Sequence, residues 1–188
     1  VTSLEKLTFT GESVSFQPMS YLGGGTFANR KQLKEVHFPQ KMKKLEFAME
    51  AFYGCTALEV CELPSVVGEF KLGSNVFTYC SSLKSINLPS TLTSISPGAF
   101  QGCTSLTEMT IPESVTGIGS SAFKDCTNLE SVVLNENTKL SYAMFVSTGL
   151  ITVDIYEKIE IPETVTTIGS RVFQNCKSLK TITIPSKM

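Results

Sequence analysis

The sequence predicts a repeat solenoid rich in β-structure, with a parallel sheet on one face and short helical turns or second strands on the other. Three observations lead to this fold class: a motif that recurs at a nearly constant period, a two-residue spacing of apolar side chains inside that motif, and a proline that closes most copies. Recurrence at a period of roughly 20 to 50 residues is typical of stacked units that share one continuous core.

The motif has the form Phe-x-x-Cys-x-x-Leu-x-x-Ile-x-Leu-Pro. Its phenylalanines stand at positions 27, 52, 77, 100, 123, 145 and 173, so the steps are 25, 25, 23, 23, 22 and 28 residues. The extra residues fall between motif positions, at 46–51, at 71–76 and after Ile155, as tolerant connecting loops vary. We therefore expect one domain over 1–188, with about seven repeats, partial units at both ends and an irregular unit at 135–161.

Each unit is expected to begin with a strand. Ile86 and Leu88 are two residues apart, which is the strand period, and Pro89 then ends the strand because it has no N–H to donate. A second extended piece is expected at 92–95, 115–119 and 165–169, followed by a tight turn into a short helical segment at each Phe. The small basic cluster at 41–44 is interpreted as a solvated turn.

Stacked units would place the Phe, Cys, Leu and Ile positions in ladders through the interior, because no single unit can bury them alone. Apolar residues make up 41% of the chain, which is enough for such a core. The formal charge of −1 does not favour nucleic acid, whose binding needs cationic side chains to neutralise phosphates. No apolar run is long enough for a membrane span.

Five of the six cysteines occupy one motif position, and Thr148 takes that place in the irregular unit. Equivalent side chains point in parallel, whereas a disulfide needs them to converge. We therefore predict free, buried thiols that act as small apolar fillers, with disulfides as the alternative. A zinc site has little to be built from, since there is no Cys-x-x-Cys pair and only one histidine. The five are Cys55, Cys80, Cys103, Cys126 and Cys176; Cys61 takes a strand Ile position.

Catalytic constellations are not recognisable in this sequence. His37 is the only histidine and is expected to point outward from a strand, with Glu35 and Glu62 as its neighbours. A histidine base would also need a nucleophile. The glycine-rich stretch at 23–26 lacks the GK[ST] ending of a phosphate-binding loop. We expect no enzymatic activity and no cofactor.

Two segments, at 111–134 and 161–185, carry the most complete motifs: IPESVTGIGSSAFKDCTNLESVVL and IPETVTTIGSRVFQNCKSLKTITIP. They resemble the BspA-like leucine-rich repeats of bacterial surface proteins, and the resemblance extends from Gly25 to Pro185. It departs at Arg30, which replaces Cys, in the Thr148 unit, and at the insertion 156–160. The resemblance implies a right-handed leucine-rich-repeat solenoid on a secreted or cell-surface protein, in a family with adhesins for host extracellular-matrix or plasma proteins.

The strand face is the candidate binding surface, because solenoids use such faces for extended partners. Its outward positions are polar and mildly acidic and include no tryptophan. A spacer that holds other domains away from a cell surface is the alternative function. The candidate ligand-binding residues are Lys6, Thr8, Glu35, His37, Glu62, Ser85, Asn87, Glu108, Thr110 and Asp154.

The two ends of the sequence lead to two further expectations. The chain has neither an initiator Met nor a signal sequence, so we expect a processed or excised piece of a longer polypeptide; a mature terminus covered by irregular residues such as 14–25 is the alternative. Both ends stop in the strand part of a unit. Open sheet edges would result, and these favour end-to-end self-association.

Overall fold

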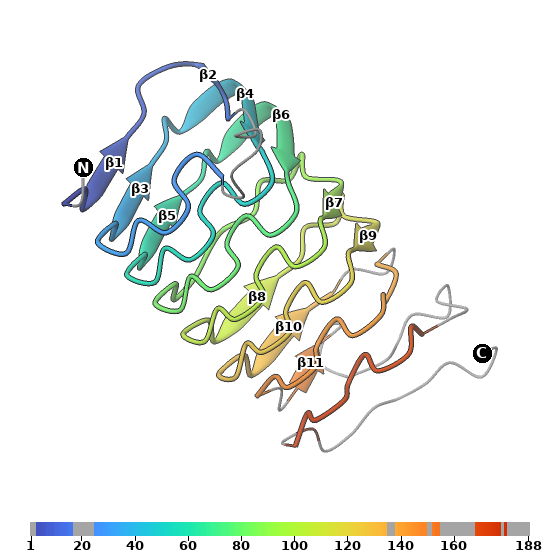
Figure 1. Ribbon diagram of the computed structural model, residues 1–188. Coiled ribbons are helices and arrows are strands. Elements are labelled where there is room, and N and C mark those ends of the chain that lie inside the picture. The colour runs from blue at the N-terminus through green and yellow to red at the C-terminus, as the bar shows by residue number, and fades with distance from the viewer. Residues whose placement is uncertain are drawn as a thin grey trace.

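The structure is a computed structural model that describes residues 3–16, 25–134, 138–149, 152–154, 168–177 and 179. The chain winds as a solenoid whose successive units stack along one axis (Figure 1). Strands from neighbouring units lie side by side, and every strand pair is parallel. The predicted parallel solenoid is confirmed.

The first face of the solenoid carries the strands predicted from the alternating apolar residues. In the strands whose side chains are described, the central residue is directed inward, and Val36, Cys61, Met109 and Val132 are all buried. The strands form two three-stranded sheets, which we call the strand face. Their bounds are Lys6–Thr8 (β1), Glu35–His37 (β3), Val60–Glu62 (β5), Glu108–Thr110 (β8), Ser131–Val133 (β10) and Thr152–Asp154 (β11).

The strand expected at Ile86 and Leu88 is absent, so this prediction is wrong. Ile86 is buried as the apolar spacing requires, but residues 81–89 contain no strand, and the sheet is interrupted between β5 and β8. The interruption coincides with the change from 25-residue to 23-residue steps. The backbone of this unit still bonds both neighbours at the Phe turns, as Phe52 N–H does to Val76 O and Phe77 N–H to Ala99 O, so the interruption is confined to the strand face.

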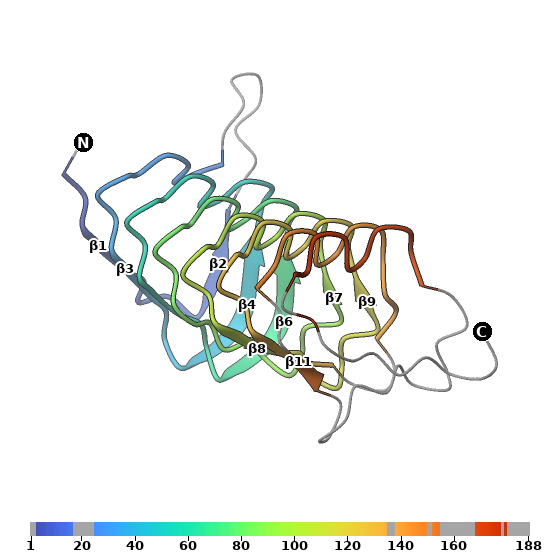
Figure 2. The same ribbon diagram turned by 90° about the horizontal axis from the view of Figure 1, so that it is seen from below.

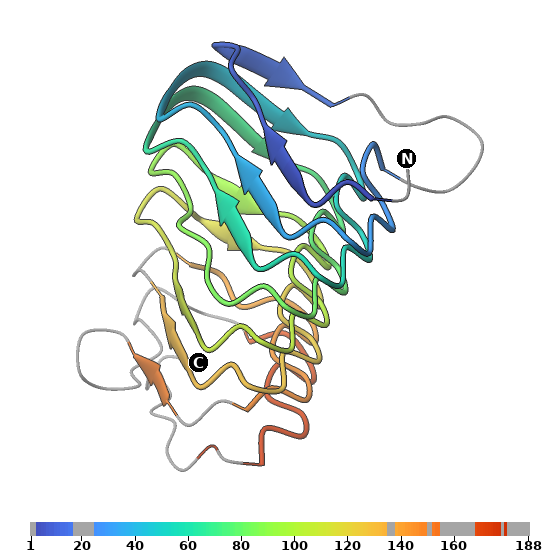
Figure 3. The same cartoon turned by 90° about the vertical axis from the view of Figure 1, so that its left-hand side faces the viewer.

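A second face holds another row of strands (Figure 3). The prediction that 41–44 is a turn is wrong, because these residues belong to one long strand in which Met42, Leu45 and Phe47 are buried. The longer steps have therefore lengthened two strands into 46–47 and 71–72, where we expected only loops. The strands are Ser13–Ser15 (β2), Lys41–Phe47 (β4), Val66–Leu72 (β6), Ser94–Ile95 (β7) and Gly117–Ile118 (β9).

The third face is a row of tight turns, one around each Phe (Figure 2). Each turn is closed by hydrogen bonds in which the N–H of residue i+3 donates to the carbonyl of residue i, as the Cys55 N–H does to the Phe52 carbonyl. No helix occurs in the described ranges. The residue two after each Phe has positive φ, and so has the residue two before each Phe from Phe52 onward, as at Gly98 (63°) and Gly102 (70°) around Phe100. These left-handed positions let the backbone reverse twice within a few residues.

Phenylalanines form a continuous stack through the core, as predicted. Phe100 is fully buried, and its ring centroid lies 5.6 Å from those of both Phe77 and Phe123. The stack extends from Phe27 to Phe173 with the rings nearly parallel at each step. Each unit therefore buries its aromatic ring only by contact with both neighbours, which makes the stability of the solenoid a property of the stack.

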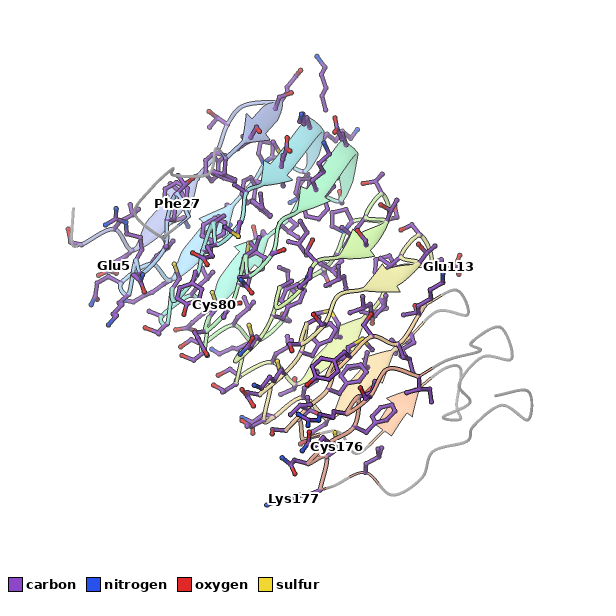
Figure 4. All side chains as sticks on the ribbon, turned by 45° about the vertical axis from the view of Figure 1, so that its right-hand side comes forward. Glu5, Phe27, Cys80, Glu113, Cys176 and Lys177 are labelled. Atoms are coloured by element: carbon purple, nitrogen blue, oxygen red, sulfur yellow. The ribbon has the colours of Figure 1, made fainter. Side chains whose placement is uncertain are left out.

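All six cysteines are free thiols, as predicted, and only Cys176 is half-buried. The structure adds a role beyond filling space. Each motif thiol donates a hydrogen bond to the backbone carbonyl of the Phe one unit earlier, as Cys80 does to Phe52 over 3.2 Å. Figure 4 marks Cys80 and Cys176, which belong to this row. Burial raises the pKa of the Cys55 thiol to about 11 and that of the Cys126 thiol to about 12.

Candidate binding face

The strand register brings the predicted binding residues into two outward rows. In β1, β3 and β5, Lys6 pairs with Glu35, and His37 lies between Thr8 and Glu62. In the second sheet the residues Glu108 and Thr110 of β8 pair with β10, and β10 in turn pairs with β11. The side chain of Asp154 lies outside the described side chains. Ser85 and Asn87 lie between the two sheets, outside any strand.

Four charged residues form one network across β1, β3 and β5. Lys6 Nζ lies 2.7 Å from Glu35 Oε2, and the same carboxylate oxygen lies 3.0 Å from Nε2 of His37. The other ring nitrogen, Nδ1, lies 2.6 Å from Glu62 Oε2. The sequence suggested these neighbours, but only the register shows that they are all connected.

The network favours the charged forms of His37 and Glu35. The hydrogen bond to Glu35, and then that to Glu62, raises the pKa of His37 above its ordinary value of 6.5. Hydrogen bonds from Lys6 and His37 lower the pKa of Glu35. Both ring nitrogens donate, since a carboxylate only accepts. Neither nitrogen is thus free to take a proton from a nucleophile, so His37 is not arranged as a catalytic base.

The strand face is hollowed on both sides of the interruption in the sheet. One hollow of about 560 Å³ lies between β5 and residues 85–90, and another of about 290 Å³ lies between the same segment and β8. Together the two hollows form a groove, which was not predicted from the sequence. The only sign of it in the sequence is that the spacing between successive motif phenylalanines changes from 25 to 23 residues at Phe77.

The second face carries charged residues that the sequence analysis did not single out. Lys44 and Lys71 alternate with Glu46 and Glu69 on the outer side of β4 and β6, with Nζ–Oε distances between 3.1 and 3.8 Å. Opposite charges therefore neutralise one another within this face. Exposed pairs of this kind contribute little to stability.

In the described part of the chain, no three His, Cys, Asp or Glu side chains come together in a way that would hold a metal ion. The same residues include no helix with the length and apolar character to cross a bilayer.

The repeat model of BspA type leucine rich repeat regions matches residues 2–71, 46–160 and 154–188, with six copies. The chain belongs to this family. Its motif, its buried Phe and Leu positions and its parallel strands are therefore those of BspA-type leucine-rich repeats. No curated protein matches the chain in sequence.

Three crystal structures share the fold of this BspA-type chain. A leucine-rich repeat protein from Bacteroides ovatus is 26% identical with a TM-score of 0.77, covering 98% of this chain and 46% of its own. The T. pallidum Leucine Rich Repeat protein is 29% identical with a TM-score of 0.70, covering 90% of this chain and 78% of its own. A leucine rich cell surface protein from Faecalibacterium prausnitzii is 26% identical with a TM-score of 0.70, covering 97% and 48%. The chain thus spans about half the length of two of these relatives.

Proposed function

We propose that this chain is a non-enzymatic binding module of a secreted or cell-surface protein, and that its strand face holds a protein ligand. The observation that carries the proposal is the strand face itself, where outward polar side chains from units up to 29 residues apart are aligned in rows. Such a surface matches an extended partner better than a small substrate, because its polar rows run across several units.

The comparisons support the proposed location. A relative with the same fold is a leucine rich cell surface protein from Faecalibacterium prausnitzii. The repeats of this chain also resemble the BspA-like repeats of bacterial surface proteins. Host extracellular-matrix or plasma proteins are accordingly the ligands to test first. The absence of enzymatic activity is part of the proposal and is supported by His37, whose two ring nitrogens both contact carboxylates.

Binding of immobilised matrix and plasma proteins by this chain would test the proposal. We expect binding at micromolar concentration for at least one ligand. Ser131→Arg, on the outer side of β10, should weaken it by inserting a long cation into the face. Ser94→Arg on the second face is the matched control and should leave it unchanged. Equal loss in both variants would place the ligand elsewhere.

A structural spacer within a larger surface protein is the second candidate. It is favoured by the Lys6–Glu35–His37–Glu62 network, whose charged groups already satisfy one another and leave few for a partner. The same assay separates the two functions. A spacer would bind no matrix or plasma protein at micromolar concentration, and the full-length polypeptide would carry large domains on either side of the solenoid.

A further inference from the structure

The interruption in the strand face leaves backbone groups without their usual partners. In neighbouring units the hydrogen-bond ladder between two strands begins where one carbonyl accepts two N–H groups. The Lys34 carbonyl, for example, accepts hydrogen bonds from the N–H groups of Glu59 and Val60. The ladder ends with a bond such as Phe38 N–H to Glu62 O at 3.2 Å. The equivalent bonds are missing on both sides of residues 84–88. All the residues that would make them, at 59–63 and 107–111, lie in the described part of the chain.

The unpaired groups face an open groove. Residues 85–88 form the ridge shared by the two hollows, of about 560 and 290 Å³. Ile86 and Cys61 are buried beneath it, whereas Ser85 and Asn87 are exposed. Backbone N–H and C=O groups are strong donors and acceptors that are nearly always paired when a surface is covered. A ligand that covers this groove must therefore supply complementary donors and acceptors along a chain.

The groove is acidic. Glu59, Glu62 and Glu108 line it, and no Lys, Arg or His is among the lining residues. Glu59 forms an ion pair with Lys84, which does not line the groove, at an Nζ–Oε2 distance of 2.7 Å, and Glu62 is paired with His37. Glu108 is in none of the ion pairs found among the described residues. Charge complementarity therefore favours a cationic side chain at the β8 side of the groove.

We propose that this groove binds an extended peptide segment of a partner protein, which pairs in β-fashion with the backbone at 84–88 and places a Lys or Arg against Glu108. The alternating donors and acceptors of an extended peptide match a strand edge, and pockets beside it select the side chains. This inference rests on the proposed binding function and names the part of the strand face that recognises the ligand.

Selection from a phage library of random linear heptapeptides on the immobilised chain would test this site. We expect enrichment of peptides that combine Lys or Arg with β-branched residues. Glu108→Lys should weaken the selected peptides by about tenfold or more, since it reverses the charge in the groove. Glu130→Lys is the matched control: Glu130 is equally exposed, lies one unit along and does not line the groove. It should change affinity by less than about twofold.

Hydrogen exchange gives a second readout with the native chain. Without peptide, the amides of 84–88 should exchange about tenfold or more faster than those of β3 and β10, which are paired on both sides, since exchange follows backbone hydrogen bonding. A selected peptide should slow them. The proposal is overturned by equal protection of 84–88 and of β3 and β10 in the free chain, by the absence of enrichment, or by peptides that bind Glu108→Lys as well as the native chain. A matrix protein whose binding is lost in Ser131→Arg but kept in Glu108→Lys would overturn the groove alone and leave the proposed function standing.

Discussion

The thiol of Cys103 donates a hydrogen bond to the backbone carbonyl of Phe77, one unit earlier, over 3.2 Å. The same carbonyl accepts the N–H of Cys80 at 3.0 Å. The motif cysteine thus connects two turns of the solenoid and also fills the space beside the phenylalanine stack. Thr148, at the equivalent place, donates instead to the carbonyl of Phe145 in its own unit.

This bond predicts the order of two cysteine substitutions. Cys103→Ser keeps a hydrogen-bond donor for the carbonyl of Phe77, whereas Cys103→Ala loses that donor. Both variants replace the sulfur with a smaller group or none. We expect Cys103→Ala to lower the free energy of unfolding by about 2 kcal/mol and Cys103→Ser by about 1 kcal/mol. Urea-induced unfolding measures both. If the thiol were only an apolar filler, the serine variant would be at least as unstable as the alanine variant, because burying a hydroxyl costs more than burying a methyl group.

Thiol reactivity should separate Cys176 from the other cysteines. Cys176 is half-buried, and the other five are buried. Burial raises the pKa of Cys126 to about 12, so almost none of it is the reactive thiolate at pH 8. We expect Ellman's reagent to modify Cys176 first in the native chain and all six only after denaturation. Rapid native labelling of Cys103 or Cys126 would contradict this arrangement.

Removing one ring from the phenylalanine stack should be costly. Phe100 is fully buried between Phe77 and Phe123, so Phe100→Ala leaves a cavity and should lower the free energy of unfolding by about 4 kcal/mol. Phe100→Leu, which keeps most of the volume, should cost about 1.5 kcal/mol. Chemical denaturation of both variants is the measurement. A loss below about 1 kcal/mol for the alanine variant would show that the stack does not carry the core.

The left-handed turn positions predict opposite effects for two glycine exchanges. Gly102 has φ of 70° and lies against the Tyr79 ring, which an added Cβ would meet at 2.5 Å. Gly102→Ala should therefore destabilise the chain by about 1–2 kcal/mol. Ser121, with φ of 57°, already has the same kind of backbone strain in the native chain. Ser121→Gly should raise the unfolding temperature slightly in thermal denaturation, and a clear decrease would contradict the strain.

The His37 network predicts a pH-dependent contribution to stability. Its neighbours raise the pKa of His37, so its stabilisation is complete below the ordinary pKa of 6.5 and is lost as pH rises through the folded-state value. The pKa of Glu35 is lowered, so its contribution is present above its ordinary value of 4.5 and is lost as pH falls. The stability difference between the native chain and His37→Gln should be greatest between these two values.

Urea titrations of both chains at pH 5.5 and pH 8.5 would measure this difference. Lys6→Met is a useful companion variant, since it removes the cation that also holds Glu35 and leaves His37 in place. A stability difference that stays constant or grows toward pH 8.5 would show that His37 is not held as an imidazolium.

The sequence was sufficient to predict which residues face inward. The spacing of Phe100, Cys103 and Leu106 repeats from unit to unit, and burial follows that spacing because all units share one core. The solenoid, its parallel strands and the free thiols followed from it. The positive φ two residues after each Phe also had a local signal, since Gly54, Gly102 and Asp125 are residue types that tolerate it.

The tertiary structure alone decided how the units meet. Hydrogen bonds between units join residues some 25 positions apart, and on the strand face they are absent at residues 84–88 although the apolar spacing continues there. For the same reason the Lys6–Glu35–His37–Glu62 network depends on strand register, and the thiol bond of Cys103 depends on the position of a carbonyl in another turn. Apolar spacing is a property of one unit and can be read along the chain, whereas backbone alignment is a property of two units and appears only when they are stacked.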